Sequence, residues 1–314
     1  MLLRRSVKKI ILSSFALLLL FLMYLIPNQK DKEYDYIVEY VNQDLIMHDI
    51  FLLDNNNYLA KTEIIVKEKE EEKLAKELIE DLIINSPNED KLPSGFKAFL
   101  NENTKINSIE IIDDLIKIDF NDYLLDTKKN LEEKTIEAII YNLTSIENIN
   151  KVLIYINGVI LNYLPKNKIN IPSPLTREYG INKEYNLKKT KNITKTTIYY
   201  LNSFNNNEYY IPVTKINNVT SDKINIIIEE LKDNNTLNSY LNYNTKLVSS
   251  EIKDNNMLLD FNEYILNDYD NLEILDEVLE TINLSIHDNY NINDVIFKVN
   301  GKEIYKNKDK VLNN

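Results

Sequence analysis

The chain has 314 residues, enough for two domains of ordinary size and a membrane anchor. It contains no cysteine, which excludes disulfide frameworks, cysteine-ligated zinc, thiol catalysis and an acyl-anchored lipoprotein. The formal net charge is −12. Residues 1–26 carry four basic and no acidic side chains, so the remainder holds 33 basic against 49 acidic residues, a net charge of −16. Such a surface repels nucleic acid, which we exclude as a partner.

The N-terminus carries a predicted membrane anchor. Residues 10–26 form an uninterrupted apolar run whose only polar members are Ser13 and Ser14, a length at the short end for a bilayer span. Four basic residues precede the run, and the basic residues after it are offset by acids. This asymmetry predicts a single-pass signal anchor in the cell membrane, with a cytoplasmic N-terminus and extracytoplasmic C-terminal domains. A cleaved signal peptide is the alternative, but the run is long for one and no small-residue cleavage site follows.

The rest of the chain is a tandem repeat. Residues 106–125 and 247–266 match at a constant offset of 141, including an Asp-Phe-Asn-acid-Tyr run that starts at Asp119 and at Asp260. A match of this length is no accident of composition, so we predict a duplicated domain. The expected boundaries are a cytoplasmic tip and anchor at residues 1–26, a stalk at 27–45, domain 1 at 46–165, a linker at 166–193, domain 2 at 194–306 and a tail at 307–314.

Each copy is expected to begin with two strands and a helix. The β-type runs and the turn compositions between them predict strands at residues 46–53 and 58–66 and at 196–201 and 209–216. Pro212 suggests that the last of these is an edge strand. A helix is predicted next because apolar residues step by three, one and three. The residues with this spacing are Ala75, Leu78, Ile79 and Leu82, and Ile224, Ile227, Ile228 and Leu231.

A hairpin, a second helix and a closing strand complete each copy. The predicted hairpin turns are at residues 113–114 and 254–256, and the second helix is expected to start at Asn130 or Asn271. Each copy then closes on a strand followed by Asn-Gly, the strongest short hairpin signal. The predicted fold is therefore α+β of the sandwich type, with two helices packed on a small, mostly antiparallel sheet in each copy.

Two degenerate motifs occur in both copies, at residues 118–121 and 259–262 and in the closing strands at 152–158 and 295–301. A helix motif at 138–144 and a joining segment at 174–182 accompany them. In this order the chain resembles the GerM-domain family of sporulation and spore germination proteins, over about residues 46–306. The second copy departs from the pattern at Asn283-Leu284-Ser285, where a register shift predicts altered packing and the same fold.

The resemblance implies a non-enzymatic protein. GerM domains are similar to the ring-building α/β modules of envelope-spanning complexes, and no catalytic residues are attributed to them. Members often carry a lipoprotein signal, whereas this chain has only the predicted transmembrane anchor. The fold expected from the resemblance is the one that the element order predicts.

Few residues are candidates for chemistry. His48 and His287 are the only histidines and occupy non-equivalent places, so we expect neither catalysis nor metal binding from them. The repeated acids Asp119/Asp122 and Asp260/Glu263 could serve as general acid and base or bind a cation, but no calcium-loop glycine accompanies them. Turn and cap hydrogen bonding at the strand exit is the favoured interpretation. We predict no catalytic, cofactor-binding or metal site, and no cofactor.

These observations predict an assembly or scaffold factor of the cell envelope in sporulation or germination. It would bind envelope proteins or self-associate through its sheet edges. The alternative is a peptidoglycan-binding module that localises or regulates cell-wall hydrolases, with exposed tyrosines stacking on sugar rings. A third hypothesis, a wall hydrolase, requires Asp119 or Asp260 as a catalytic residue.

Overall fold

The computed structural model describes residues 46–233 and 237–306 and, near the N-terminus, residues 7, 9, 13–19 and 21. Leu45–Asn314 form one compact unit and Met1–Asp44 another.

In the N-terminal unit, residues 13–19 are helical. Among the residues described, no helix is both long and apolar enough to cross a membrane. Most of the predicted anchor, the whole predicted stalk and the predicted tail at 307–314 lie outside the described residues.

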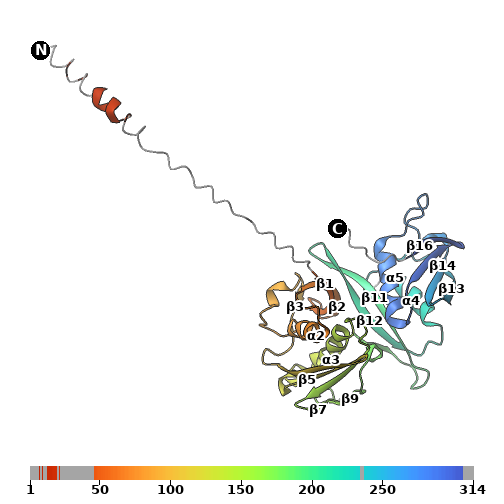
Figure 1. The fold of residues 1–314 in the computed structure, drawn as a ribbon. Coiled ribbons are helices and arrows are strands. Elements are labelled where there is room, and N and C mark those ends of the chain that lie inside the picture. Colours follow the sequence, from red (N-terminus) through yellow and green to blue (C-terminus); the bar gives the residue numbers. More distant parts are fainter. Residues whose placement is uncertain are drawn as a thin grey trace. The chain divides into compact units, whose positions relative to one another are not determined.

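The first copy contains the elements that the sequence predicts, in the same order (Figure 1). They are β1 (Ile46–Asp54), β2 (Leu59–Val66), α2 (Glu71–Glu80), β3 (Phe96–Lys97), β4 (Ile106–Ile112), β5 (Leu115–Phe120), α3 (Lys129–Leu143), β6 (Lys151–Ile156) and β7 (Val159–Ile160). The segment that joins the copies adds three short strands: β8 (Tyr163–Leu164), β9 (Ile169–Asn170) and β10 (Glu184–Asn186).

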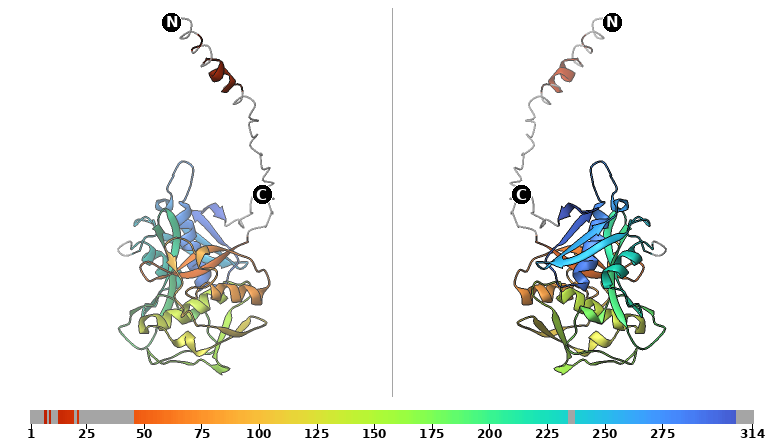
Figure 2. Two further views of the ribbon diagram at one scale, coloured as in Figure 1. Left: turned by 90° about the vertical axis from the view of Figure 1, so that its left-hand side faces the viewer. Right: turned by 90° about the vertical axis from the view of Figure 1, so that its right-hand side faces the viewer.

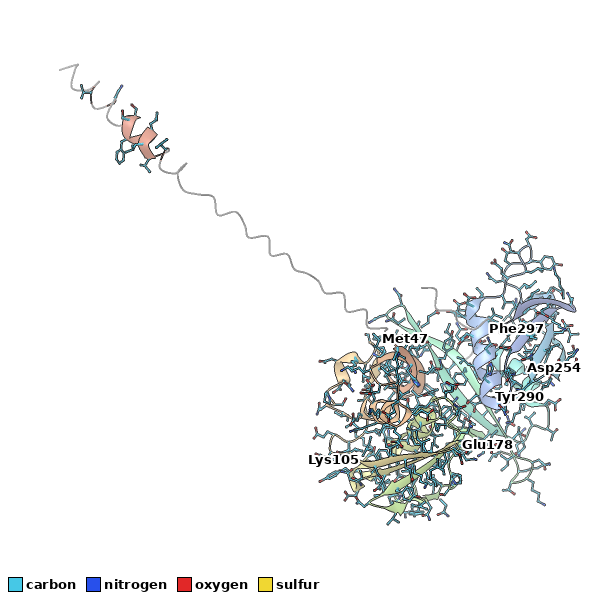
Figure 3. The ribbon with its side chains drawn as sticks, in the orientation of Figure 1. Met47, Lys105, Glu178, Asp254, Tyr290 and Phe297 are labelled. Carbon is cyan, nitrogen blue, oxygen red and sulfur yellow. The ribbon has the colours of Figure 1, made fainter. Side chains whose placement is uncertain are left out.

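The second copy repeats this order. Its elements are β11 (Thr194–Phe204), β12 (Asn207–Asn217), α4 (Lys223–Leu231), β13 (Leu247–Lys253), β14 (Asn256–Phe261), α5 (Asp276–Asn289), β15 (Val295–Val299) and β16 (Lys302–Lys306). Asp254, at the turn between β13 and β14, is labelled in Figure 3.

Each copy has a small sheet of four strands. The orders are β4-β5-β6-β7 and β13-β14-β15-β16. The outer pairs of each sheet are antiparallel, as predicted, but the central pairs β5–β6 and β14–β15 are parallel. A parallel pair requires a long crossover, and α3 and α5 lie in these crossovers.

A larger sheet joins the two copies. Its order is β10-β12-β2-β1-β3, with β11 also pairing with β12. Strands β2 and β12 hold equivalent places in the two copies, and they pair antiparallel at Lys61 and Tyr210. The copies thus meet edge to edge, and both side views show them in contact (Figure 2).

The two hydrophobic cores overlap at this sheet. The core of the first copy includes Tyr199 from β11, and the core of the second includes Ala60 from β2. Phe120 and Phe261, the aromatic residues of the repeated motif, are fully buried in their respective cores. Burial of apolar surface therefore stabilises the two copies together.

Two sequence predictions are wrong in detail. Helix α5 begins at Asp276 and not at Asn271, because the Asp268 carboxylate accepts the N–H groups of Asp270 and Asn271 and closes a turn there. Pro212 lies inside β12, which has neighbours on both sides, so it does not mark an edge strand. Proline is tolerated there because the side of β12 away from β11 has no ladder partner at this point. The Pro212 carbonyl instead accepts a hydrogen bond from the side chain of Asn182.

Candidate functional site at the junction of the two copies

The repeated aspartates hold the closing turns of their own copies. The Oδ1 atom of Asp119 accepts the N–H of Gly158 at 3.0 Å, and that of Asp260 accepts the N–H of Gly301 at 3.0 Å. Both glycines have positive φ, 79° and 81°, which glycine adopts without strain. These contacts support the turn-capping interpretation of the acids.

The asparagine of the same motif holds a second loop. Asn121 Oδ1 accepts the N–H of Lys105 at 3.1 Å, and its amide donates to the carbonyl of Asn103 at 2.9 Å. Asn262 makes the same two bonds to Lys246 and Asn244, at 2.9 and 3.1 Å. The Asp-Phe-Asn run is therefore a structural corner: phenylalanine fills the core while the two polar residues fix the loops beside it.

The histidines take no part in a common site. The ring of His48 lies 2.8 Å from the carbonyl of Asp49, next to it in the chain. His287, in the other copy, is exposed. Neighbouring protein atoms partly desolvate the imidazole ring and so lower the pKa of His287, with Asp294 and Glu280 acting in the opposite direction. Within the described part of the chain, no three His, Asp or Glu side chains are placed to hold a metal ion.

A buried polar cluster lies where the copies meet, around Asn182 of the joining segment. Its Oδ1 accepts the N–H of Leu59 at 3.0 Å, and its amide donates to the carbonyls of Leu59 at 2.7 Å and Pro212 at 2.8 Å. The Asn182 N–H donates to Glu137 at 2.9 Å. Asn182 has a φ of 45°, a left-handed conformation that asparagine tolerates better than most residues. One side chain therefore bridges β2 of the first copy and β12 of the second.

Arg177 makes a second link between the copies; its neighbour Glu178 is labelled in Figure 3. The Arg177 Nε donates to Thr144 Oγ1 at 2.9 Å, and its Nη1 donates to Asp288 Oδ1 at 2.9 Å. Thr144 ends α3 of the first copy, whereas Asp288 lies on α5 of the second, with its side chain 1% exposed. The guanidinium also stacks over the ring of Tyr141, 4.8 Å from its centroid, and the hydroxyl of this tyrosine donates to Asp288 at 3.2 Å.

A buried charged group completes the junction. Lys183 pairs with Glu133 and with Glu137, 3.4 Å away in the second case, and its Nζ lies 3.6 Å from the centroid of the Tyr179 ring. Burial raises the pKa of Glu137, while Lys183 and the N–H of Asn182 act in the opposite direction. Removing one member would leave a buried charge without its partner, which is strongly destabilising. The junction therefore locks the two copies together.

These junction residues were missed as a site by sequence reasoning. Residues 166–193 were predicted to be a linker because they lack periodicity, and only the resemblance of residues 174–182 to a family joining segment marked them. A positional match did exist: Glu133 and Glu137 on α3 correspond to Asp276 and Glu280 on α5 at the offset of 143 that also relates Gly158 to Gly301. Four acids at matching helix positions could have drawn attention to this face.

The fold and the junction define a class of protein: a duplicated α+β module whose copies are fused into one compact body. Comparison with known proteins gives the family. The family described as "Germane: Sporulation and spore germination" matches residues 49–162 and 197–305. The chain belongs to this family of sporulation and spore germination proteins.

One relative and one solved structure are similar over most of the chain. "Spore germination protein GerM" of Bacillus subtilis (strain 168) is 34% identical over 267 residues, which cover 82% of this chain and 72% of that protein. The structure of the tandem GerMN domains of the sporulation protein GerM from Bacillus subtilis matches with a TM-score of 0.74 and 32% identity. The match covers 82% of this chain and 92% of that one. The descriptions of both name sporulation or germination and no reaction.

Proposed function

We propose that this chain is a non-enzymatic assembly or scaffold factor of the cell envelope during sporulation or spore germination. In this proposal residues 1–26 anchor it in the cell membrane as a single-pass protein, with a cytoplasmic N-terminus and both copies outside. Its partners are envelope proteins or further copies of itself. The family and the relatives' descriptions support the sporulation role. The apolar run at residues 10–26 supports the anchor, and the surfaces of the fused body support the proposed partners.

The observation that carries the proposal is the presence of outer strands on a body whose two halves are locked together. Strands β4 and β13 end their sheets, and apolar side chains on them are exposed: Ile112 at 43%, Val248 at 61% and Ile252 at 54%. An outer strand with exposed apolar side chains can add a strand from a partner. The locked junction holds the two edges at a fixed separation, which suits a scaffold.

Complementation tests this proposal. The chain is expressed in a Bacillus subtilis strain that lacks its spore germination protein GerM, and spore yield and germination are scored. We expect the wild-type chain to restore both in part and the double variant V248K/I252K to restore less, at equal protein level. Val219→Lys is the matched control, because Val219 is 42% exposed and lies outside both edge strands. Equal restoration by the double variant and the control would refute the role of the edges.

Exposed tyrosines favour a second candidate function, peptidoglycan binding. Tyr243 is 80% and Tyr269 is 69% exposed in the second copy. At the offset of 141 the first copy has Glu102 and Lys128 in these places. Exposed aromatic rings can stack on the apolar faces of sugars, and at these two positions only the second copy has them. Sedimentation of the purified chain with purified peptidoglycan tests the candidate; a chain that stays in the supernatant contradicts it.

A further inference from the structure

The sheet that joins the copies opens on both sides of a single bridge. Strand β2 pairs with β12 only at Lys61 and Tyr210, although β2 pairs along its length with β1 and β12 along its length with β11. On either side of this bridge the facing edges of β2 and β12 do not pair with each other. We call the opening beside Leu59 and Pro212 the junction gap. The opening between residues 62–64 of β2 and 207–209 of β12 is the open groove.

The chain's own joining segment fills the junction gap. The carbonyl of Ile181 accepts the N–H of Thr214 on β12 at 2.9 Å, and the side chain of Asn182 bonds to the backbone of Leu59 and Pro212. Strand β10 then continues the sheet in parallel with β12. An extended peptide therefore fits between the diverging edges of β2 and β12, and hydrogen bonds to the backbone hold it there.

A lysine anchors this segment to a helix. Lys183 pairs with Glu133 and Glu137 on α3 of the first copy. The equivalent acids of the second copy, Asp276 and Glu280 on α5, line the open groove. The two openings thus have the same plan: two diverging strand edges beside a helix with two acids one turn apart.

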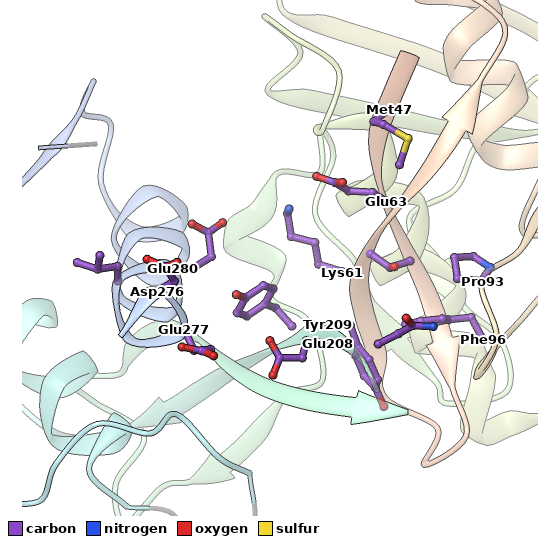
Figure 4. A pocket seen from close by; sticks show the side chains of 14 residues that line it. Met47, Lys61, Glu63, Pro93, Phe96, Glu208, Tyr209, Asp276, Glu277 and Glu280 are labelled. Carbon is purple, nitrogen blue, oxygen red and sulfur yellow. The ribbon is translucent and has the colours of Figure 1, made fainter. Parts of the chain in front are cut away.

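Among the lysines and arginines that the structure describes, none pairs with Asp276 or Glu280 as Lys183 pairs with Glu133 and Glu137. The open groove has a volume of about 810 Å³, and α5 presents Asp276, Glu277 and Glu280 to it across from β2 (Figure 4). Lys61, which also lines the groove, pairs with Asp49 at 2.6 Å. Among the described residues, the three acids of α5 and Glu208 form no ion pair.

The field in the groove is accordingly negative. Burial raises the pKa of Tyr210, and the carboxylates of Glu280 and Glu208 raise it further. Met47 and Phe96 supply apolar surface to the same groove, with Met47 52% exposed. A ligand that fits must therefore be extended, positively charged and partly apolar.

We propose that the open groove binds a basic, extended segment of a partner protein, which adds a strand between the edges of β2 and β12. A lysine or arginine of the partner lies between Asp276 and Glu280, as Lys183 lies between Glu133 and Glu137. The backbone pairs at residues 62–64 and 207–209. This inference rests on the proposed function in taking the partner to be an envelope protein.

A peptide copied from the joining segment is the probe. It has the sequence of residues 178–187 with Glu178→Lys and Glu184→Lys, carries fluorescein, and is titrated with the full-length chain in a fluorescence anisotropy assay. We expect a Kd of about 10–100 μM, typical of a small transient interface. Glu280→Lys in the chain should weaken binding by at least about tenfold, because it places like charges together. Glu147→Lys, an exposed charge reversal of the same size away from the groove, should change it by less than about twofold.

Three results of the anisotropy assay would overturn the inference. One is the absence of binding at 1 mM, because a Kd of 1 mM corresponds to only about −4 kcal/mol of binding free energy. Another is equal weakening by the two charge reversals. The third is an affinity that rises more than about threefold when residues 307–314 are removed, which would make the chain's own tail the occupant. Hydrogen exchange adds a check of position: the peptide should slow exchange at residues 62–64 and 207–209, and slowing only elsewhere contradicts the groove.

Failure of this inference is separable from failure of the proposed function. The peptide assay needs no sporulating cell, and the complementation assay scores the edges of β4 and β13. A chain that fails to bind the peptide but restores sporulation refutes the groove alone. A chain that binds the peptide but restores nothing refutes the sporulation role alone.

Discussion

In the first copy, Asn142 on α3 accepts the N–H of Phe51 at 2.8 Å and donates to its carbonyl at 3.0 Å. In the second copy, Ser285 stands at the matching helix position and accepts only the N–H of Tyr199, at 2.9 Å. Asn289, one turn later, bonds to both the N–H and the carbonyl of Thr197. The expected change in packing at residues 283–285 is thus confirmed. The same helix-to-strand link is made with different residues.

The two copies also differ in how they use the equivalent helix acids. Glu133 and Glu137 bind Lys183 inside the body, and Glu137 is almost fully buried. Asp276 is exposed and Glu280 is half-buried beside the open groove. Of these two equivalent helix faces, one is part of the junction and the other lines the open groove. Each of the following changes tests a part of this contrast.

The largest effect on stability is expected at the junction gap, which Asn182 fills. Asn182→Ala removes the bonds to Leu59 and Pro212 and leaves their backbone groups buried without partners. We expect a loss of roughly 3–4 kcal/mol in the free energy of unfolding, measured by urea denaturation of the full-length chain. Asn182→Gly should lose nearly as much, because glycine relieves the strain of positive φ but restores no hydrogen bond.

Asn55→Ala is the control for Asn182→Ala. Asn55 is an exposed turn residue, so its replacement should change the free energy of unfolding by less than about 0.5 kcal/mol. A loss at Asn182 no larger than at Asn55 would mean that the junction does not hold the copies together.

The corner motif, in contrast, should be equally sensitive in the two copies. Asp119→Ala and Asp260→Ala each remove one charge-assisted bond to a glycine N–H, and each should cost about 1–2 kcal/mol. The two losses should agree within about 0.5 kcal/mol, again by urea denaturation. The hydrolase hypothesis predicts a different readout: turnover of peptidoglycan by the wild-type chain that Asp119→Asn or Asp260→Asn abolishes.

The corners and elements were predictable because they depend on neighbours in sequence. The turns at Asp113 and Asp254, the stripe of Ala75 and Leu78, and the Asn-Gly turns all follow from local spacing. The junction was not predictable in this way, since Lys183 and Asp288 meet partners far along the chain. Asn271 is a residue type that often starts a helix, but its N–H donates to the side chain of Asp268 and forms a turn instead.

A pH-dependent effect of similar size is expected at Asp81, whose counterpart in the second copy, Glu230, pairs with Lys215 at 3.4 Å. Asp81 is only 1% exposed, and neither oxygen of its carboxyl group has a hydrogen bond of normal geometry. Burial raises its pKa to about 6, opposed by Asn88 and Lys91. The native state therefore holds its proton to higher pH than the unfolded state does. This contribution to stability is full below about pH 4 and declines up to about pH 6.

Asp81→Asn should remove this dependence. At pH 7 we expect the variant to be more stable than the wild type by about 1–2 kcal/mol, less than the full shift allows because the new amide also lacks partners. At pH 4 the two should differ by less than about 0.5 kcal/mol. Urea denaturation at both pH values measures the difference in stability. A difference that does not change with pH would contradict the raised pKa of the buried Asp81 carboxyl group.

The smallest effect on stability, and the sharpest on the surface contrast, is expected from exchanging Tyr243 and Glu102. The loops around them have the same frame: Asn103 and Asn244 donate their N–H groups to Asn101 and Asn242. Since both exchanged residues are exposed, Tyr243→Glu and Glu102→Tyr should each change the free energy of unfolding by less than about 0.5 kcal/mol. If tyrosine on this frame binds peptidoglycan, Tyr243→Glu should weaken sedimentation about two- to tenfold, and Glu102→Tyr should strengthen it. Unchanged sedimentation of both variants would mean that these tyrosines do not bind peptidoglycan. It would favour assembly through the strand edges, because the shared hydrogen bonds of these loops would then be structural in both copies.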